Sequence, residues 1–140
     1  VTVFPSRLCA LETDASDIPD LVPVLAVLGA CADGSTVLRG VGRLRIKESD
    51  RLEAVRELLG TLGVTVGISG DSETLTVTGN RDGITGGTVS SFGDHRIAMS
   101  AAVAALAANS PVTVTDAGAV EKSAPDFFEQ MKRFAEVEYV

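Results

Sequence analysis

The stretch "LRIKESDRLEAV", residues 44–55, joins a charged turn to the start of an amphipathic helix. Six of its twelve residues are charged, and most of these come before the apolar repeat begins. The first turn of a helix has unpaired N–H groups and the positive end of the helix dipole, so anions bind there readily. Charged side chains at this position can therefore converge on a ligand while the apolar face of the helix packs into the core.

The apolar periodicity of the rest of the chain places this helix in a longer alternation of elements. It predicts strands over residues 2–8, 35–41, 64–69, 73–78, 87–90 and 111–115, and helices over residues 20–33, 50–62, 96–108 and 125–136. This order is typical of an α/β or α+β domain in which sheets surround buried helices. No linker or low-complexity tract divides the chain.

Composition and charge exclude several classes of function. With 140 residues and 45% hydrophobic content, the chain has the size of one folded domain. Its net charge of −7 opposes binding to a nucleic-acid backbone. The longest nearly uncharged stretch, residues 21–32, is too short to span a membrane and contains Pro23. We interpret Cys9 and Cys31 as buried thiols of a cytoplasmic protein, because they lack the spacing of a metal site and the density of a disulfide scaffold.

Ionisable residues recur at every expected helix start. They occur in "DIPD" (17–20), "KESDR" (47–51), "GDHR" (93–96) and "EKSAPD" (121–126). Four cations among these stretches suit carboxylate or phosphate groups, as planar guanidinium groups or as point charges: Arg51, Arg96, Lys47 and Lys122. Asp20 and Glu48 are the candidates for general acid or base chemistry beside so many cations.

Each of these residues also has a purely structural interpretation. Five of them are good helix caps: Asp17, Asp20, Ser49, Asp50 and Asp94. The charges of 47–51 could form solvated salt bridges of little energetic value, and His95 is a lone histidine. The glycine-rich loop over residues 79–87 lacks the lysine of a P-loop. The residues alone therefore predict a site for a small, multiply charged anion and define no reaction.

Four longer stretches resemble a known family. They are "DASDIPDLVPVLAVLGACADGST", "LRIKESDRLEAVRELLGTLG", "SSFGDHRIAMSAAVAAL" and "VEKSAPDFFEQM". In this order and at these separations they resemble the C-terminal part of the 5-enolpyruvylshikimate-3-phosphate synthases (3-phosphoshikimate 1-carboxyvinyltransferases), over residues 10–135. The resemblance implies transfer of the enolpyruvyl group of phosphoenolpyruvate to the 5-hydroxyl of shikimate 3-phosphate, with release of phosphate. This step belongs to aromatic amino acid biosynthesis and, in this family, uses no metal or organic cofactor.

The resemblance also implies substrate-binding roles. Lys47 is similar to a residue that contacts the shikimate substrate, and Arg51 and Arg96 resemble the pair that clamps the carboxylate of phosphoenolpyruvate. His95 lines the family's site. Arg43 stands where some members carry a polar amide that contacts shikimate, so the resemblance assigns it no role.

Three catalytic roles follow in the same way. Asp20 resembles the carboxylate that contacts the shikimate hydroxyls and helps to deprotonate the attacking one. Glu48 resembles the acid that exchanges a proton with the methylene carbon of phosphoenolpyruvate. Lys122 is similar to the lysine that faces its phosphate, although Ala124 replaces a usual aromatic neighbour.

The resemblance further implies an incomplete protein. Family members have two domains of repeated β–α–β–α–β–β units, with the active site in the cleft between the domains. Residues 1–140 would supply about two such units, as a partial domain that lacks the N-terminal domain as its partner. A start at Val1 rather than Met agrees with a fragment or a processed chain. The alternatives are an anion-binding module without turnover, or the sister enolpyruvyl transferase that acts on UDP-N-acetylglucosamine.

Overall fold

The structure is a computed structural model that describes residues 2, 4, 6–80 and 82–140. Its elements fall into two consecutive regions. The first region contains β1 (Glu12–Asp14), α1 (Val22–Ala30), β2 (Ser35–Arg39), α2 (Arg51–Thr61), β3 (Val66–Ile68) and β4 (Thr74–Thr78). The second contains β5 (Gly87–Ser90), α3 (His95–Ala105), β6 (Val112–Thr115) and α4 (Phe127–Met131). Short 3-10 helices precede α1, α2 and α4, namely η1 (Pro19–Leu21), η2 (Gly42–Ile46) and η3 (Ala117–Lys122).

The two regions begin with the same strand pairing. In the first sheet the strand order is β1-β2-β4-β3, with β1 parallel to β2 and β4 antiparallel to both of its neighbours. In the second sheet β5 is parallel to β6. The N–H of Ala15 donates to the carbonyl of Arg39 at 2.8 Å, and the N–H of Ser91 donates to that of Thr115 at 3.2 Å. The second region therefore repeats the strand–helix–strand arrangement with which the first begins.

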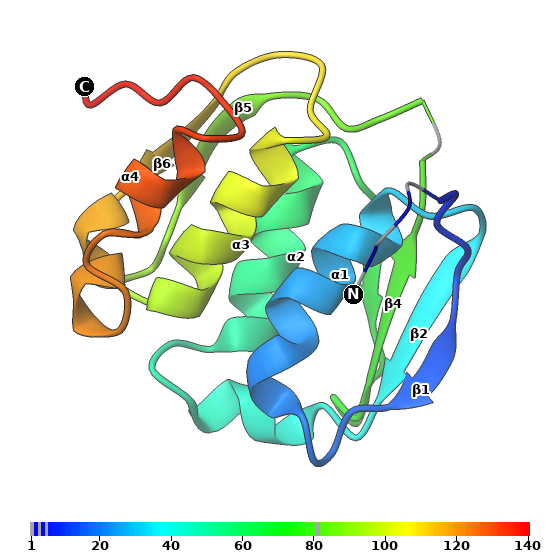
Figure 1. Ribbon diagram of the computed structural model, residues 1–140. Coiled ribbons are helices and arrows are strands. Elements are labelled where there is room, and N and C mark those ends of the chain that lie inside the picture. Colours follow the sequence, from blue (N-terminus) through cyan, green and yellow to red (C-terminus); the bar gives the residue numbers. More distant parts are fainter. Residues whose placement is uncertain (1, 3, 5, 81) are drawn as a thin grey trace.

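The helices lie between the sheets. Figure 1 shows α1, α2 and α3 side by side, with β1, β2 and β4 on one side and β5 and β6 on the other. The helices α1 and α2 contact the four-stranded sheet, α2 also contacts β5, and α3 contacts β6. Large apolar side chains from these elements are fully buried, among them Leu38, Leu52, Leu59, Leu75 and Ile97. The predicted α/β class, with sheets around buried helices, is confirmed.

Local sequence explains where α2 begins and ends. Its N-cap is Asp50, whose side chain accepts the N–H of Glu53 at 3.2 Å, and this satisfies one of the free donors of the first turn. The chain leaves the helix through Gly63, whose φ of 82° favours glycine. Between these ends, the apolar side chains of Leu52, Val55, Leu58 and Leu59 are buried, as the predicted amphipathic pattern requires. The prediction for this helix is confirmed.

Three expected elements differ from the structure. The strand predicted over residues 2–8 lies partly outside the described residues, at 3 and 5, and the described residues of that stretch are not in a strand. The first strand is instead β1, which is short, polar and at the edge of its sheet, and so carries no apolar alternation. The predicted helix over 20–33 is divided into η1 and α1, where Pro23 occupies the first turn of α1.

The last helix is shorter than the predicted 125–136. It begins after Pro125, and beyond Met131 the chain continues in turns, with the N–H groups of Phe134 and Ala135 donating to the Met131 carbonyl at 2.9 and 3.1 Å.

The cysteine interpretation is wrong for one residue. Cys9 is exposed, because it lies in the segment that precedes β1 and pairs only with Asp33 at the edge of the fold. Cys31 is half-buried, and this burial raises the pKa of its thiol. Among the helices of the described residues, none is long and apolar enough to cross a membrane.

Candidate active site

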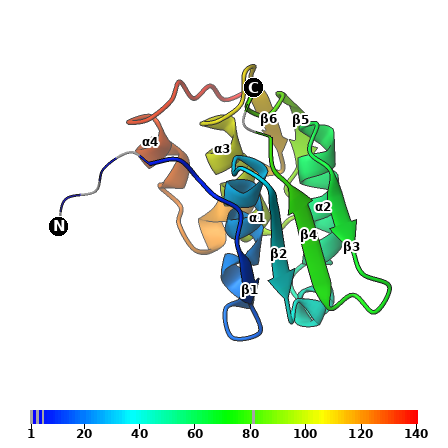
Figure 2. The ribbon, with the colours of Figure 1, turned by 90° about the vertical axis from the view of Figure 1, so that its right-hand side faces the viewer.

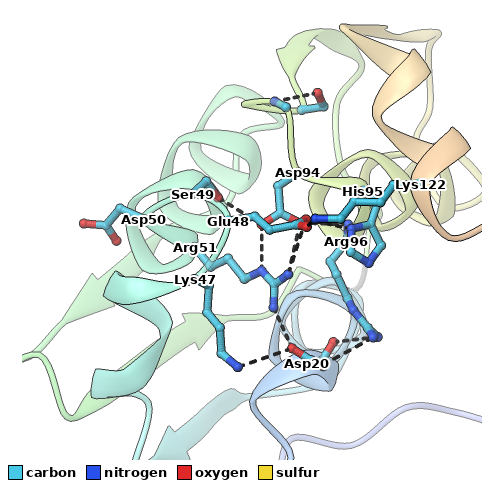
Figure 3. A network of polar contacts seen from close by, with 12 residues as sticks. Asp20, Lys47, Glu48, Ser49, Asp50, Arg51, Asp94, His95, Arg96 and Lys122 are labelled. Atoms are coloured by element: carbon cyan, nitrogen blue, oxygen red, sulfur yellow. Dashed lines mark hydrogen bonds and ion pairs between the residues drawn. The ribbon is translucent and has the colours of Figure 1, made fainter.

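The starts of α2 and α3 meet through a buried ion pair. Arg51 is the first residue of α2, and Asp94 is the N-cap of α3. The Nε of Arg51 lies 2.7 Å from Oδ2 of Asp94, and its second terminal nitrogen lies 3.2 Å from Oδ1. The side chains are 3% and 0% exposed. This two-point contact fixes the plane of the guanidinium group, as Figure 3 shows.

The carboxylate of Asp20 forms ion pairs with three cationic side chains. The remaining terminal nitrogen of Arg51 donates to its Oδ1 at 2.7 Å, and Lys47 lies 3.7 Å from the same oxygen. Arg96 lies 3.4 Å from Oδ2. The hydrogen bond from Arg51 is the main cause that lowers the pKa of Asp20, and the charges of Arg96 and Lys47 add to it. Asp20 is therefore ionised at neutral pH and joins η1 to α2 and α3.

Glu48 is held between a histidine and a lysine. Its Oε2 lies 2.7 Å from Nδ1 of His95, the first residue of α3. Its Oε1 contacts the ammonium group of Lys122, which ends η3. Arg51 lies 3.9 Å from Oε2 as well. The turn before α2 thus places one carboxylate against both partners from the second region.

Asp94 has a larger role than the sequence predicted. Its expected function as a helix cap is confirmed, because Oδ1 accepts the N–H of Arg96 at 2.9 Å. It also accepts the Ser49 hydroxyl at 3.1 Å, in addition to Arg51. Burial raises the pKa of Asp94, but the hydrogen bonds from Arg51, Arg96 and Ser49 outweigh it, so the pKa lies below the usual range. Its place in "GDHR" predicted only the helix cap, because Arg51 is 43 positions away in the sequence.

Arg96 retains unused hydrogen-bonding capacity. Its terminal nitrogens reach the Asp20 carboxylate at 3.4 Å and the Asp20 carbonyl at 3.4 Å. Its Nε is buried, and within the described part of the chain it has no hydrogen-bond partner. The side chain as a whole is 33% exposed. A buried donor without a partner is energetically costly. The guanidinium group of Arg96 is therefore suited to donate hydrogen bonds to an anionic ligand.

All the sequence-predicted site residues come together in this network. They are Asp20, Lys47, Glu48, Arg51, His95, Arg96 and Lys122. Among the expected caps, Asp50 caps α2, whereas Ser49 turns to Asp94 instead. Arg43 is exposed.

Three neighbouring side chains carry groups that can bind a metal ion. Ligand atoms of Glu48, Asp94 and His95 lie within 4.8 Å of one another. However, Asp94 is occupied by Arg51 on both oxygens, and Glu48 contacts Lys122. A divalent cation there would meet two fixed positive charges, so these residues do not fit a metal centre.

Solved structures with the same fold define the class. The chain superimposes on EPSP synthase from Acinetobacter baumannii with a TM-score of 0.82 and 31% identity, covering 92% of this chain and 31% of that one. It also matches the enolpyruvyl transferase NikO from Streptomyces tendae, with a TM-score of 0.73 and 25% identity over 94% of this chain and 29% of that chain. The fold is that of the enolpyruvyl transferases.

Sequence comparison narrows the class to a family. The family model of EPSP synthase (3-phosphoshikimate 1-carboxyvinyltransferase) matches residues 2–131. A protein named 3-phosphoshikimate 1-carboxyvinyltransferase from Rhodopseudomonas palustris is 46% identical, with 91% of this chain and 29% of that protein covered. One of the same name from Chloroflexus aggregans is also 46% identical, over 97% of this chain and 32% of the relative. The chain belongs to the EPSP synthase family and spans about a third of the length of these relatives.

Proposed function

We propose that this chain carries half of an active site that transfers the enolpyruvyl group of phosphoenolpyruvate to the 5-hydroxyl of shikimate 3-phosphate. The observation that carries the proposal is that the starts of α1, α2 and α3 and the end of η3 converge on Asp20, Glu48 and the cations around them. Family membership supports the choice of reaction. The other half of the site would come from the N-terminal domain of a longer protein, in the cytoplasm.

The first part of the reaction is binding of two anionic substrates. Arg51 and Arg96 would clamp the carboxylate of phosphoenolpyruvate, and Lys122 would face its phosphate. Arg96 suits this role because its buried Nε has no partner among the described residues. Arg51 suits it because Asp94 holds its guanidinium in one plane. Lys47 and His95 would contact the remaining substrate groups.

The second part is proton transfer at oxygen and carbon. The 5-hydroxyl adds to C2 of phosphoenolpyruvate while the methylene carbon C3 gains a proton, which gives a tetrahedral ketal. Loss of phosphate and of one C3 proton then leaves the enol ether. Asp20 would accept the hydroxyl proton, because its lowered pKa keeps it ionised. Glu48 would exchange the proton at C3, with His95 and Lys122 fixing its two oxygens.

In the absence of ligand, the cations that pair with Asp20 lower its basicity. Arg51, Arg96 and Lys47 make Asp20 a weak base as long as they all face it. A substrate carboxylate that drew Arg96 away would raise the basicity of Asp20. Binding would therefore prepare the base.

Two assays on the purified chain test the proposal. The first measures phosphate release from phosphoenolpyruvate with shikimate 3-phosphate, for the chain and for Lys47→Ala. We expect no release above the background, because the second half of the site is missing. The second measures binding of shikimate 3-phosphate by calorimetry, where Lys47→Ala should weaken binding. The change Lys132→Ala, at an exposed lysine that directly follows α4 and pairs with Glu129, should not.

The outcomes separate the alternatives. Binding without release, lost with Lys47, supports a half-site. Release that Lys47→Ala abolishes would mean that the chain assembles a complete site alone. Binding of UDP-N-acetylglucosamine in preference to shikimate 3-phosphate would assign the sister reaction. No binding of any of these ligands would overturn the proposal.

A further inference from the structure

The turn that carries Lys47 and Glu48 is held mainly by side chains. It spans residues 47–49, between the end of η2 and the start of α2. In the described chain, none of the N–H groups of this turn donates to a backbone carbonyl. The backbone bonds of α2 begin only after it, where the N–H of Ala54 donates to the Asp50 carbonyl at 2.9 Å. The position of Lys47 and Glu48 therefore depends on side-chain contacts around the turn.

Arg45 joins the two ends of this turn. Its Nη1 donates to Oδ2 of Asp50 at 2.7 Å. The other oxygen of Asp50 caps α2, so both carboxylate oxygens are engaged. Figure 3 shows Asp50 turned away from the network around Asp20. Arg45 thus holds the side of the turn that faces away from the site.

A second contact ties Arg45 to the hairpin of β3 and β4. Its Nε donates to the hydroxyl of Ser72 at 2.8 Å. Ser72 lies at the tip of the hairpin with a φ of 62°, a left-handed conformation that is uncommon outside glycine. The tip is fixed there, because the N–H of Ser72 donates to Ser69 at 2.8 Å and that of Ser69 donates to Thr74 at 2.9 Å. Figure 2 shows that the hairpin turns at the same end of the molecule as η2.

The hairpin tip also contacts the start of η2. The N–H of Val41 donates to the carbonyl of Glu73 at 3.3 Å. The Glu73 side chain lies so close to Gly42 that an added Cβ would be 2.2 Å from its Oε1. Leu44, between Gly42 and Arg45, is fully buried. The tip therefore supports η2 at its start through the backbone and near its end through Arg45.

These contacts are too exposed to contribute much to stability. The side chains of Arg45 and Asp50 are 38% and 40% exposed, and ion pairs at such positions add little to the free energy of unfolding. Their main effect is geometric. A planar guanidinium group that donates from two nitrogens fixes the relative position of its two acceptors.

We propose that Arg45 and Ser72 are positioning residues, which order the 47–49 turn so that Lys47 and Glu48 face the substrates before these bind. A site whose charged groups are already ordered loses less conformational entropy when a ligand binds. This positioning role rests on the proposed function, whereas the order of the turn is a property of the free chain.

The arginines of the site have a separate support. Asp94 holds the guanidinium group of Arg51 at two points and accepts the N–H of Arg96. Neither contact passes through the hairpin tip. Loss of the contacts of Arg45 should therefore disorder the 47–49 turn and leave the two arginines in place.

Three variants test the support. Arg45→Ala removes both contacts. Arg45→Lys keeps the charge but offers a compact ammonium group, which cannot reproduce the planar two-nitrogen contact. Ser72→Gly removes the hydroxyl, keeps every charge and suits the φ of 62°. The matched control is Arg56→Ala, at an exposed arginine of α2 whose partner, Glu53, lies on the same helix.

Relaxation of ¹⁵N in the free chain measures the order of the turn. We expect amide order parameters at residues 47–49 near about 0.85 in the unaltered chain and in Arg56→Ala, falling toward about 0.6 in the three test variants. The midpoint of urea unfolding should shift no more for Arg45→Ala than for Arg56→Ala, because both arginines are exposed. Loss of order without loss of stability separates positioning from folding.

Calorimetric titration with shikimate 3-phosphate measures the consequence for binding. Each of the three test variants should bind about tenfold more weakly, because Lys47 must be ordered when the ligand binds. The control Arg56→Ala should bind as the unaltered chain does. NMR shifts that phosphoenolpyruvate causes at Arg51 and Arg96 should persist in every variant.

Four results would overturn the proposal. One is an unchanged order of residues 47–49 in Arg45→Ala. Another is full affinity for shikimate 3-phosphate in Arg45→Lys, which would mean that Arg45 acts through its charge alone. The third is full affinity in Ser72→Gly, and the fourth is a loss of stability in Arg45→Ala far beyond that of Arg56→Ala. If the unaltered chain does not bind shikimate 3-phosphate, the proposed function fails, and relaxation of the free chain still decides whether Arg45 orders the turn.

Discussion

The two regions of this molecule begin with the same strand–helix–strand arrangement, but they differ in how many strands flank the second strand. In residues 12–78 a central strand, β2, has neighbours on both sides, and Leu38 is fully buried. In residues 87–131 the equivalent strand, β6, has one neighbour among the described residues, and Val114 is half-buried. The helix starts of both regions nevertheless meet in one network. The site thus depends on the parts that both regions retain, whereas the burial of the second strand depends on the part that differs.

The largest expected effect is on the ion pair that joins the two regions. Asp94→Ala leaves Arg51 buried without its main partner, which costs about 3–5 kcal/mol of the free energy of unfolding. The matched control is Asp50→Ala, which removes the N-cap of the neighbouring helix at an exposed site and costs about 1 kcal/mol. Urea unfolding measures both. Equal losses would mean that the pair does not hold the regions together.

Truncation of one valine in each sheet measures how differently the two sheets are buried. Val77→Ala in β4 removes a fully buried side chain from the complete sheet and should cost about 2–3 kcal/mol. The same change at Val114, which is half-buried in β6, should cost under about 1 kcal/mol. Equal costs from thermal or urea unfolding would show that the second sheet is as well covered as the first.

A smaller effect concerns the carboxylates at the two corresponding helix starts. The folded state lowers the pKa of Asp20 and of Asp94, so the unfolded chain binds more protons in the acid range. Their contribution to stability is complete above about pH 5 and is lost as the pH falls through their usual value of about 3.9 toward the lowered pKa. Asp20→Asn should therefore make stability less dependent on pH between about 5 and 3. An unchanged slope in urea unfolding across this range would contradict the assignment.

The sequence predicted the presence of helices and strands better than the ends of helices and the position of the edge strand. Strong periodicity placed α2 within one residue of its bounds at 51–61 and β5 at its bounds of 87–90. It missed β1, because a three-residue polar edge strand has no alternation to detect. It also overextended the last helix, where tertiary packing rather than propensity decides the end.

The sequence predicted which residues belong to the site but not how they contact one another. The family resemblance identified seven residues that the fold brings together, such as Asp20 and Lys122. It did not predict that Asp94 holds Arg51 at two points, because a helix cap and a buried ion-pair partner have the same signal in sequence. The contact between Arg51 and Asp94, which are 43 positions apart, follows from the packing of α2 against α3.

The most direct measurement of the central claim is a titration of the chain with phosphoenolpyruvate, observed by NMR at the arginine Nε–H groups. We expect saturable shifts at Arg51 and Arg96, which Arg96→Gln reduces strongly. The control change, Arg133→Gln at an exposed arginine outside the network, should leave them unaltered. Shifts of similar size in Arg96→Gln, or shifts spread over exposed arginines instead, would contradict an anion site at the meeting point of the two regions.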